Sequence, residues 1–336
     1  MKRNVNLLTK LLVLASLSAS LASCQGSNNQ VILYMSTEEE KITYIYDALK
    51  KKFPNYDIVT QYTDTGTLLS KLQGEGKNTQ CDIFYDLEGA NAEILLANNS
   101  DLFADLSYLD FSIYDSSVMN PDRKDYRYAC NVKDDCAIIV NKKVLSDKNL
   151  PIPSTYDDLL KPEYKGLIVM PNPKTSGTGY SFYNGVVSLR GEDEAMKYFK
   201  SLNDNIVEYT TSGSAPLKLI QRGEAGIGVA QLFEIVSFSN EDSNLQPVYL
   251  SEGLSYNIFN MGMINGHETR EAVKNVFDYL FTELNPELVP HFFGEKAYKN
   301  QAACAVANYP TDIKEIEMKN LFNPTKKNEL LDKWVY

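Results

Sequence analysis

Four short segments combine hydroxyl side chains with glycine where a strand-like stretch gives way to a helix-like one. Helix N-termini expose unpaired N–H groups and carry partial positive charge. Glycine lets the backbone approach a ligand closely, and hydroxyls add further donors, so such a turn can bind an anion without lysine or arginine. The segments are Ser36-Thr37, Thr65-Gly66-Thr67, Thr175-Ser176-Gly177-Thr178-Gly179 and Ser212-Gly213-Ser214-Ala215.

Each segment has an ordinary alternative, because serine and threonine cap helices in every class of protein. Ser36-Thr37 or Thr65 alone would be explained by a cap. The loop from Thr175 to Gly179 holds two glycines and three hydroxyls in five residues, which is more than a cap needs. Two lobes that each supply two such turns predict a cleft that closes around an oxyanion.

Strand-like and helix-like segments alternate along most of the chain. Short apolar runs at 31–35, 56–62 and 81–85 are each followed by apolar residues at helical spacing, and the pattern returns with runs at 167–170, 206–209 and 227–230. This alternation predicts an α/β fold with mainly parallel sheets flanked by helices. In such sheets the turns after the strands lie at one edge, where ligands bind.

The length beyond the leader, about 300 residues, exceeds one typical core and predicts two lobes. Strands at 248–250 and 256–264 return toward the first half of the chain. We therefore expect residues 31–110 with 250–298 to form one lobe and residues 111–249 with 299–336 the other, hinged by crossover strands.

The N-terminus has the features of an export signal. Lys2, Arg3 and Lys10 precede a short apolar run, which is too short to span a bilayer. Leu21 to Cys24 resembles a bacterial lipobox, whose cysteine would carry the lipid. We expect a signal peptide at 1–23, a tether at 24–30 and a chain anchored through Cys24 to the outer face of the cytoplasmic membrane or on the periplasmic side. The alternative is a plain secretory signal.

The formal net charge is −11, and removing the three basic residues of the leader leaves 30 basic and 44 acidic residues, a charge of −14. This balance argues against nucleic acid or an anionic membrane surface as a partner. A monomer is expected.

Four cysteines remain besides Cys24. Cys130 and Cys136 flank a polar segment at 131–135 that reads as a turn between two strands, so a hairpin disulfide is one prediction and free buried thiols are the other. There are only two histidines, and no Cys/His spacing typical of zinc sites is present. No metal site and no cofactor are expected.

The stretch from Tyr156 to Glu224 resembles family 1 extracellular solute-binding proteins of the type II periplasmic-binding fold. The resemblance is carried by residues 154–166, 173–180, 209–216 and 222–224, with further matches at 34–40 and 65–69. That group includes receptors for ferric iron, 2-aminoethylphosphonate and hexose phosphates. The loop Thr175–Gly179 is similar to the phosphoryl-binding loop of the latter two.

The resemblance also bears on the ligand. Ferric receptors usually carry two adjacent tyrosines where this chain has the segment from Ala230 to Glu234, and Phe233 stands where some sugar-phosphate receptors have histidine. The resemblance implies that Gln231, Glu234 and Glu252 face the ligand, with the two acids holding hydroxyls or an ammonium group. Solvated surface acids are the alternative.

Three functional classes follow. The first is the receptor of an ABC importer, which passes a small anionic solute to a permease with its ATPase; iron is the alternative solute. The second is an exported hydrolase, but the sequence has no Gly-x-Ser-x-Gly elbow, His-Glu-x-x-His motif or Walker A loop. The third is a sensor with the same fold, which the sequence does not separate from the first.

Overall fold

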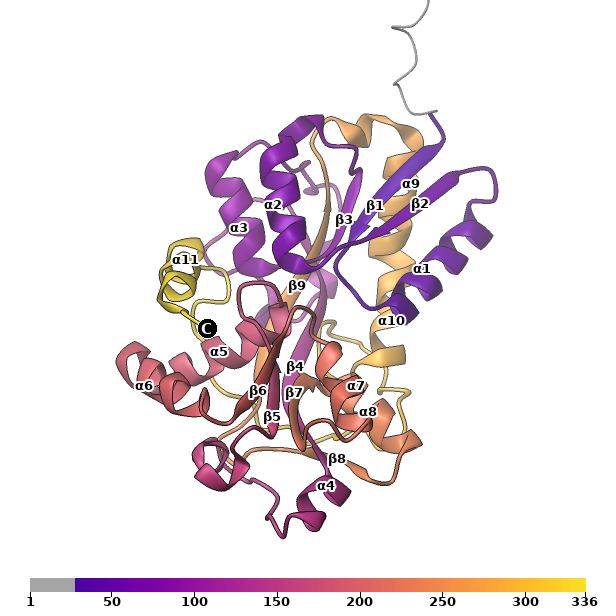
Figure 1. Cartoon of the computed structure of the whole chain (residues 1–336). Helices are drawn as coiled ribbons and strands as arrows, with labels where there is room; N and C mark the ends of the chain where they lie inside the picture. Colours follow the sequence, from indigo (N-terminus) through magenta and orange to yellow (C-terminus); the bar gives the residue numbers. More distant parts are fainter. Residues whose placement is uncertain (1–27) are drawn as a thin grey trace, which may run out of the picture.

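The computed structural model describes residues 28–336 (Figure 1). The predicted signal peptide, the lipidation site at Cys24 and the first part of the tether lie outside these residues. Among the described residues, no helix is long and apolar enough to cross a membrane.

Nine strands of the described chain form one mixed sheet in the order β2-β1-β3-β9-β4-β7-β5-β6, with β8 paired to β4. The outer groups β2-β1-β3 and β7-β5-β6 are parallel, whereas β9 and β4 run antiparallel to their neighbours. The strands are β1 (Gln30–Met35), β2 (Asp57–Tyr62), β3 (Ile83–Glu88), β4 (Ala129–Asn141), β5 (Ile168–Pro171), β6 (Ile206–Thr210), β7 (Ile227–Gln231), β8 (Leu245–Val248) and β9 (Ser255–Met263).

Helices cover the sheet at both ends, in the α/β arrangement that the sequence predicts (Figure 1). Helix α9 continues through a π-helical turn at Leu280–Leu284 into α10. The helices are α1 (Glu39–Lys52), α2 (Thr65–Glu75), α3 (Gly89–Asn98), α4 (Lys142–Asp147), α5 (Gly177–Arg190), α6 (Glu192–Leu202), α7 (Ala215–Gln221), α8 (Leu232–Glu241), α9 (Glu271–Tyr279), α10 (Asn285–Phe292) and α11 (Pro324–Lys333).

Strand β4 joins the two ends of the sheet. Its first part pairs with β9, and its second part, from Cys136 onward, pairs with β7 and then β8. All thirteen of its residues are buried. Both β4 and β9 therefore run from one group of helices to the other, as Figure 1 shows.

The buried apolar residues gather in separate clusters at the two ends. Side chains of β1, α1 and α9 pack in one cluster, and those of β5, α5 and α6 in another, which also takes Leu330 and Trp334 from the C-terminal segment. Phe111, Tyr114 and Val118 pack in the first cluster, although the predicted boundary put residue 111 onward in the second lobe.

The predicted hairpin disulfide is wrong. Cys130 and Cys136 lie six residues apart on the single strand β4, which places their Cα atoms about 20 Å from each other at the usual rise of a strand. Both thiols are free and buried. The polar residues between them form no turn, and two of them find partners from other parts of the chain: Asn131 donates to Asp86, and Lys133 binds Glu315 at 2.5 Å.

Candidate functional site

A cavity of about 670 Å³ lies between the helix starts of the two ends of the sheet. One wall is formed by the start of α1 and the turn between β2 and α2, and the other by the starts of α5 and α8 and the loop before α7. Its volume is typical of a pocket for a small organic molecule. The lining residues are Ser36–Glu40, Ile42, Thr60, Tyr62, Asp64, Thr65, Thr175–Thr178, Ser212–Ser214, Lys218, Gln231, Phe233, Glu234, Ser237, Phe238 and Phe259.

Most of the predicted site residues meet in this cavity. All four hydroxyl-rich turns contribute to it, and each follows the carboxyl end of a strand. Strands β1 and β2 run in the opposite direction to β5 and β6, so the two pairs of turns face each other across the cavity. The predicted residues that line it are Ser36, Thr37, Thr65, Thr175, Ser176, Gly177, Thr178, Ser212, Gly213, Ser214, Gln231 and Glu234.

Four predicted residues do not line the cavity. Gly66 and Gly179 instead pack against backbone, Gly66 against the carbonyl of Lys174 and Gly179 against that of Pro171. Ala215 begins α7 behind the loop. Glu252 lies elsewhere: its carboxylate accepts the backbone N–H of Tyr156 at 3.1 Å and the hydroxyl of Ser251 at 3.0 Å.

The start of α5 is the part of the cavity wall most suited to an oxyanion. Ser176 is the N-cap, and its Oγ accepts the N–H of Gly179 at 3.3 Å. The N–H groups of Gly177 and Thr178 remain at the open end of the helix, where an α-helix has no partner for them. Gly179 is required here, because a Cβ would lie 2.5 Å from the Pro171 carbonyl oxygen.

The loop before α7 is joined to the start of α5. Thr175 Oγ1 donates to the carbonyl of Thr211 at 2.9 Å, and Gly213 packs directly on the hydroxyl of Thr178. The two segments therefore form one surface with several backbone and side-chain donors.

The facing wall comes from α1 and α2. The N-cap of α1 is Glu38, and it makes no side-chain capping bond, so the N–H groups of Glu39 and Glu40 remain at the open end of the helix. Asp64 caps α2 by accepting the N–H of Thr67 at 2.9 Å. Thr65, directly after it, has a buried Oγ1 without a hydrogen-bond partner.

Three predicted site residues carry unpartnered buried polar atoms within the described structure: Thr65 Oγ1, Gln231 Oε1 and Glu234 Oε2. Most buried polar groups in folded proteins are hydrogen-bonded. A polar ligand in this cavity could form the hydrogen bonds that these three atoms lack.

Acidic residues outnumber basic ones in the lining. Lys218 is the one lysine or arginine among the lining residues, against five acids: Glu38, Glu39, Glu40, Asp64 and Glu234. Burial raises the pKa of the Glu234 carboxyl well above its usual range, and the nearby carboxylate of Glu38 raises it further. This end of the cavity favours a hydrogen-bond donor or a cation.

Lys41 neutralises part of this acidity from behind the wall. Its Nζ lies 2.5 Å from Glu38 and 3.7 Å from Asp86, between the rings of Phe233 and Phe293 at 4.8 and 4.6 Å from their centroids. Burial lowers the pKa of Lys41, but its carboxylate neighbours more than offset that effect, so the ammonium stays charged.

Several lining residues were not predicted from the sequence. Glu38–Glu40 and Asp64 directly follow or precede the predicted turns, and this adjacency is the only signal that could have found them. Phe259 and Lys218 reach the cavity from β9 and α7, and no local pattern marks them.

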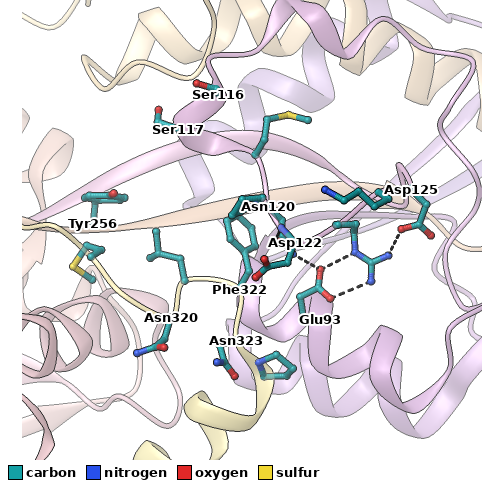
Figure 2. Close-up of a pocket in the computed structure, with 17 residues that line it drawn as sticks. Glu93, Ser116, Ser117, Asn120, Asp122, Asp125, Tyr256, Asn320, Phe322 and Asn323 are labelled. Atoms are coloured by element: carbon teal, nitrogen blue, oxygen red, sulfur yellow. Dashed lines mark hydrogen bonds and ion pairs between the residues drawn. The ribbon is translucent and has the colours of Figure 1, made fainter.

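A second cavity, of about 820 Å³, lies between α3, residues 116–125 and the C-terminal segment (Figure 2). Three of its charged groups are paired with each other: Arg123 binds Glu93 at 2.8 Å and Asp125 at 2.6 Å. None of its lining residues has an unpartnered buried polar side-chain atom. It shares no lining residue with the first cavity.

Residues 101–284, more than half of the chain, match the sequence family described as bacterial extracellular solute-binding proteins. An uncharacterized protein of Haemophilus influenzae is 25% identical over 286 residues, covering 82% of this chain and 80% of that protein.

Two solved structures share the fold. The periplasmic binding protein P5PA has a TM-score of 0.80 at 20% identity, over 91% of this chain and 98% of that one. AfuA from Actinobacillus pleuropneumoniae, solved with fructose-6-phosphate bound, has a TM-score of 0.79 at 22% identity, over 91% and 97%.

The solved structures establish the periplasmic-binding-protein fold. The family match indicates an extracellular or periplasmic protein that binds small solutes, and proteins of this family are typically not enzymes. The chain belongs to the bacterial extracellular solute-binding protein family and is a solute-binding protein of ABC-type transport.

Proposed function

We propose that this chain is the receptor for a small organic phosphate or phosphonate with a hydrogen-bond donor, such as an amino or hydroxyl group, at its other end. The observation that carries the proposal is the convergence of four hydroxyl-rich turns on one cavity whose lining also includes the Glu234 carboxyl. Aminoalkylphosphonates and sugar phosphates both carry an oxyanion at one end and an amino or hydroxyl donor at the other.

The oxyanion end of the ligand would lie against the start of α5 and the loop before α7. Donors available there include the N–H groups of Gly177 and Thr178, and Thr65 Oγ1 from the facing wall. Charge-assisted hydrogen bonds to an oxyanion are about twice as strong as neutral ones, so these groups can bind the ligand without a lysine or arginine. Support also comes from AfuA, which shares the fold and was solved with a sugar phosphate.

A ligand held by both walls would draw them together, and hinge motion of this kind is how many binding proteins signal to a permease. We propose that β4 and β9 are the hinge, that the two ends of the sheet act as lobes, and that the closed form is recognised by an ABC permease and its ATPase.

We also propose that lipid on Cys24 anchors the receptor at the membrane. Labelling with palmitate and mass spectrometry of the mature N-terminus test this. The label is expected on the wild type and absent from Cys24→Ser, and an unlabelled wild type would contradict the anchor.

Calorimetric titration of the purified chain with 2-aminoethylphosphonate, glucose 6-phosphate and ferric citrate tests the ligand class. Heat of binding is expected with a phosphonate or phosphate. The absence of heat and of any thermal shift with both would contradict the proposal.

Thr65→Val tests the site itself, because it removes the unpartnered hydroxyl while keeping the shape of the side chain. A hydrogen bond to a charged group contributes about 1.5–3 kcal/mol, so affinity is expected to fall at least about tenfold. Ser70→Ala on the same helix is the control, since Ser70 donates to Gly66 and does not line the cavity.

Ferric iron is the second candidate, because carboxylates outnumber lysines in the lining and iron prefers anionic oxygens. Among residues 28–336, however, no three His, Cys, Asp or Glu side chains are grouped so that they could hold a metal ion. Binding of ferric citrate alone would favour iron over an organophosphate.

A further inference from the structure

A small space adjoins the cavity and shares Gly177, Thr178, Gln231 and Phe259 with it. Its other lining residues come from β4, β9 and α5, and include Asp134 and Asn257. The space has no room for a water molecule. We call it the floor chamber.

The register of the sheet decides which side chains face the floor chamber. Asp134 pairs with Asn257, and Cys136 pairs with Gln231. Because paired residues and every second residue along a strand share a face, Asp134, Asn257 and Gln231 point to the same side. Asp135 also borders the floor chamber, but its pairing with Tyr256 puts its side chain on the other face of β4.

Two of these side chains are buried without a hydrogen-bond partner. Asp134 is 4% exposed and its Oδ1 is unpartnered, and Gln231 is 9% exposed and its Oε1 is unpartnered. Both oxygens are acceptors, and water cannot enter between them. No donor is bonded to Asp134 Oδ1 in the described structure, and an ionised carboxyl without that bond would be a costly buried charge.

The surrounding charges do not neutralise an Asp134 carboxylate. Lys41 is the cation that faces it, but Lys41 is already bound to Glu38 and Asp86. The other titratable groups near Asp134 are all acidic or neutral: Glu38 before α1, Glu295 after α10, Asp135 and Cys136 on its own strand, and Tyr309 of the C-terminal segment.

We propose that Asp134 is a proton-binding site in the floor of the cleft, and that the cleft takes its anionic ligand with this carboxyl protonated. A protonated Asp134 has one O–H donor, and the unpartnered Oε1 of Gln231 is an acceptor on the same wall. Burial raises the pKa of Asp134 well above its usual range, which agrees with this assignment.

The proton matters for binding because the floor chamber lies under the first turn of α5, whose N–H groups face the proposed oxyanion. Ionisation of Asp134 would place a negative charge behind those donors and repel the ligand. Affinity for an anion is therefore expected to fall as pH rises through the pKa of Asp134, by up to about tenfold per pH unit. This second part rests on the proposed function.

The protonation itself is tested without any ligand. Infrared difference spectra of the wild type minus Asp134→Asn at neutral pH are expected to show the carbonyl band of a protonated carboxyl, which disappears as pH rises. A difference spectrum that contains the band of an ionised carboxylate and no carbonyl band of a protonated carboxyl would overturn the proposal. This outcome does not depend on whether an organophosphate binds.

The coupling between ligand affinity and the protonation of Asp134 is tested by calorimetric titration of 2-aminoethylphosphonate and glucose 6-phosphate between pH 6 and about pH 9. Asp134→Asn imitates the neutral carboxyl, so it is expected to bind more tightly than the wild type at high pH and equally well at low pH.

Asp135→Asn is the matched control, because it removes an equally buried carboxyl on the other face of the same strand. It is expected to retain the pH dependence of the wild type. An identical pH dependence in Asp134→Asn and the wild type would overturn the coupling. If neither ligand binds to any variant, the proposed function fails, while the infrared result still decides the proton site.

Discussion

A Cβ atom on Gly66, at the start of α2, would lie 2.8 Å from the carbonyl oxygen of Lys174, in the loop before α5. The two walls of the cavity are therefore in backbone contact beside the predicted anion site. Gly177 makes a similar approach to Phe259, where a Cβ would lie 2.9 Å from the ring. Any side chain at either glycine would hold the walls apart.

Gly66→Ala is expected to weaken ligand binding about tenfold, since crowding a tight contact typically costs about 1–3 kcal/mol. The fold should be retained, because Gly66 lies in the first turn of a helix that tolerates alanine. Gly74→Ala in the same helix is the control, as a Cβ there meets nothing within 4 Å. Titration with 2-aminoethylphosphonate measures both, and equal affinities would refute the contact's role.

Glu234→Gln tests how the acidic side chain in the cavity lining selects the ligand. The wild type is expected to prefer 2-aminoethylphosphonate to ethylphosphonate, because an ammonium group beside Glu234 would favour ionisation of its carboxyl and donate to it. Glu234→Gln should lose that preference by about tenfold, the usual worth of a charge-assisted hydrogen bond.

Glu252→Gln is the control for this experiment, since Glu252 binds Tyr156 N–H outside the cavity. It should retain the preference of the wild type. If Glu252→Gln lost the preference for 2-aminoethylphosphonate and Glu234→Gln kept it, then Glu252 and not Glu234 would be the acid that binds the ammonium group.

A buried ion pair joins α11 to the other end of the sheet. Lys327 binds Glu88, the residue that ends β3, and both side chains are almost wholly buried. Lys327 also lies 4.3 Å from the ring centroid of Tyr180 in α5. Burial lowers the pKa of Lys327, which reflects the cost of placing this charge in the interior.

Lys327→Met is expected to lower the free energy of unfolding by about 3–5 kcal/mol, because it leaves Glu88 buried without its cation. The double variant Lys327→Met with Glu88→Gln should recover most of this loss. Lys326→Met is the control, since Lys326 forms only exposed pairs with Glu192 and Glu329. Denaturant unfolding measures each variant, and a double variant as unstable as the single one would contradict the argument.

Glu295 predicts a pH dependence of stability. Burial raises its pKa to about 7, whereas the unfolded value is near 4.3. The native state thus binds a proton that the unfolded state has released, so stability is expected to fall as pH rises from about 4 to about 7. Glu295→Gln should remove about 4 kcal/mol of that fall.

Glu192→Gln is the control for the pH experiment, because the ammonium groups of Lys326 and Lys333 lower the Glu192 pKa to about 2. The Glu192 carboxylate therefore contributes its full share to the free energy of unfolding above pH 5, and this share is lost only as pH falls toward 2. Glu192→Gln should therefore show the wild-type slope between pH 5 and about pH 8. A wild-type slope in Glu295→Gln would contradict the raised pKa.

The turns of the site were predictable because their signal is local. A hydroxyl and glycine cluster between a strand-like and a helix-like run marks a helix start wherever it occurs. Within one parallel group such starts share one edge, so the pattern placed Ser36 with Thr65 and Thr175 with Ser212, and the expected cleft between two lobes brought the two pairs together.

The predicted hairpin at 131–135 failed for the opposite reason. Asn131, Lys133, Asp134 and Asp135 form a polar run that normally marks a turn. Their partners, such as Asp86 and Glu315, come from distant parts of the chain, and those contacts keep the strand straight and buried. Glu252 was misplaced similarly, because its partner Tyr156 lies 96 residues away.

The sequence by itself determined the α/β class and the hydroxyl-rich turns, because strand and helix periodicity and helix starts depend on neighbouring residues. Only the tertiary structure decided that β4 crosses between the two ends of the sheet, that Phe259 and Lys218 reach the cavity, and that Asp134 faces a dry chamber that adjoins it. These features depend on strand register and on contacts between residues far apart in the chain, which no local pattern encodes.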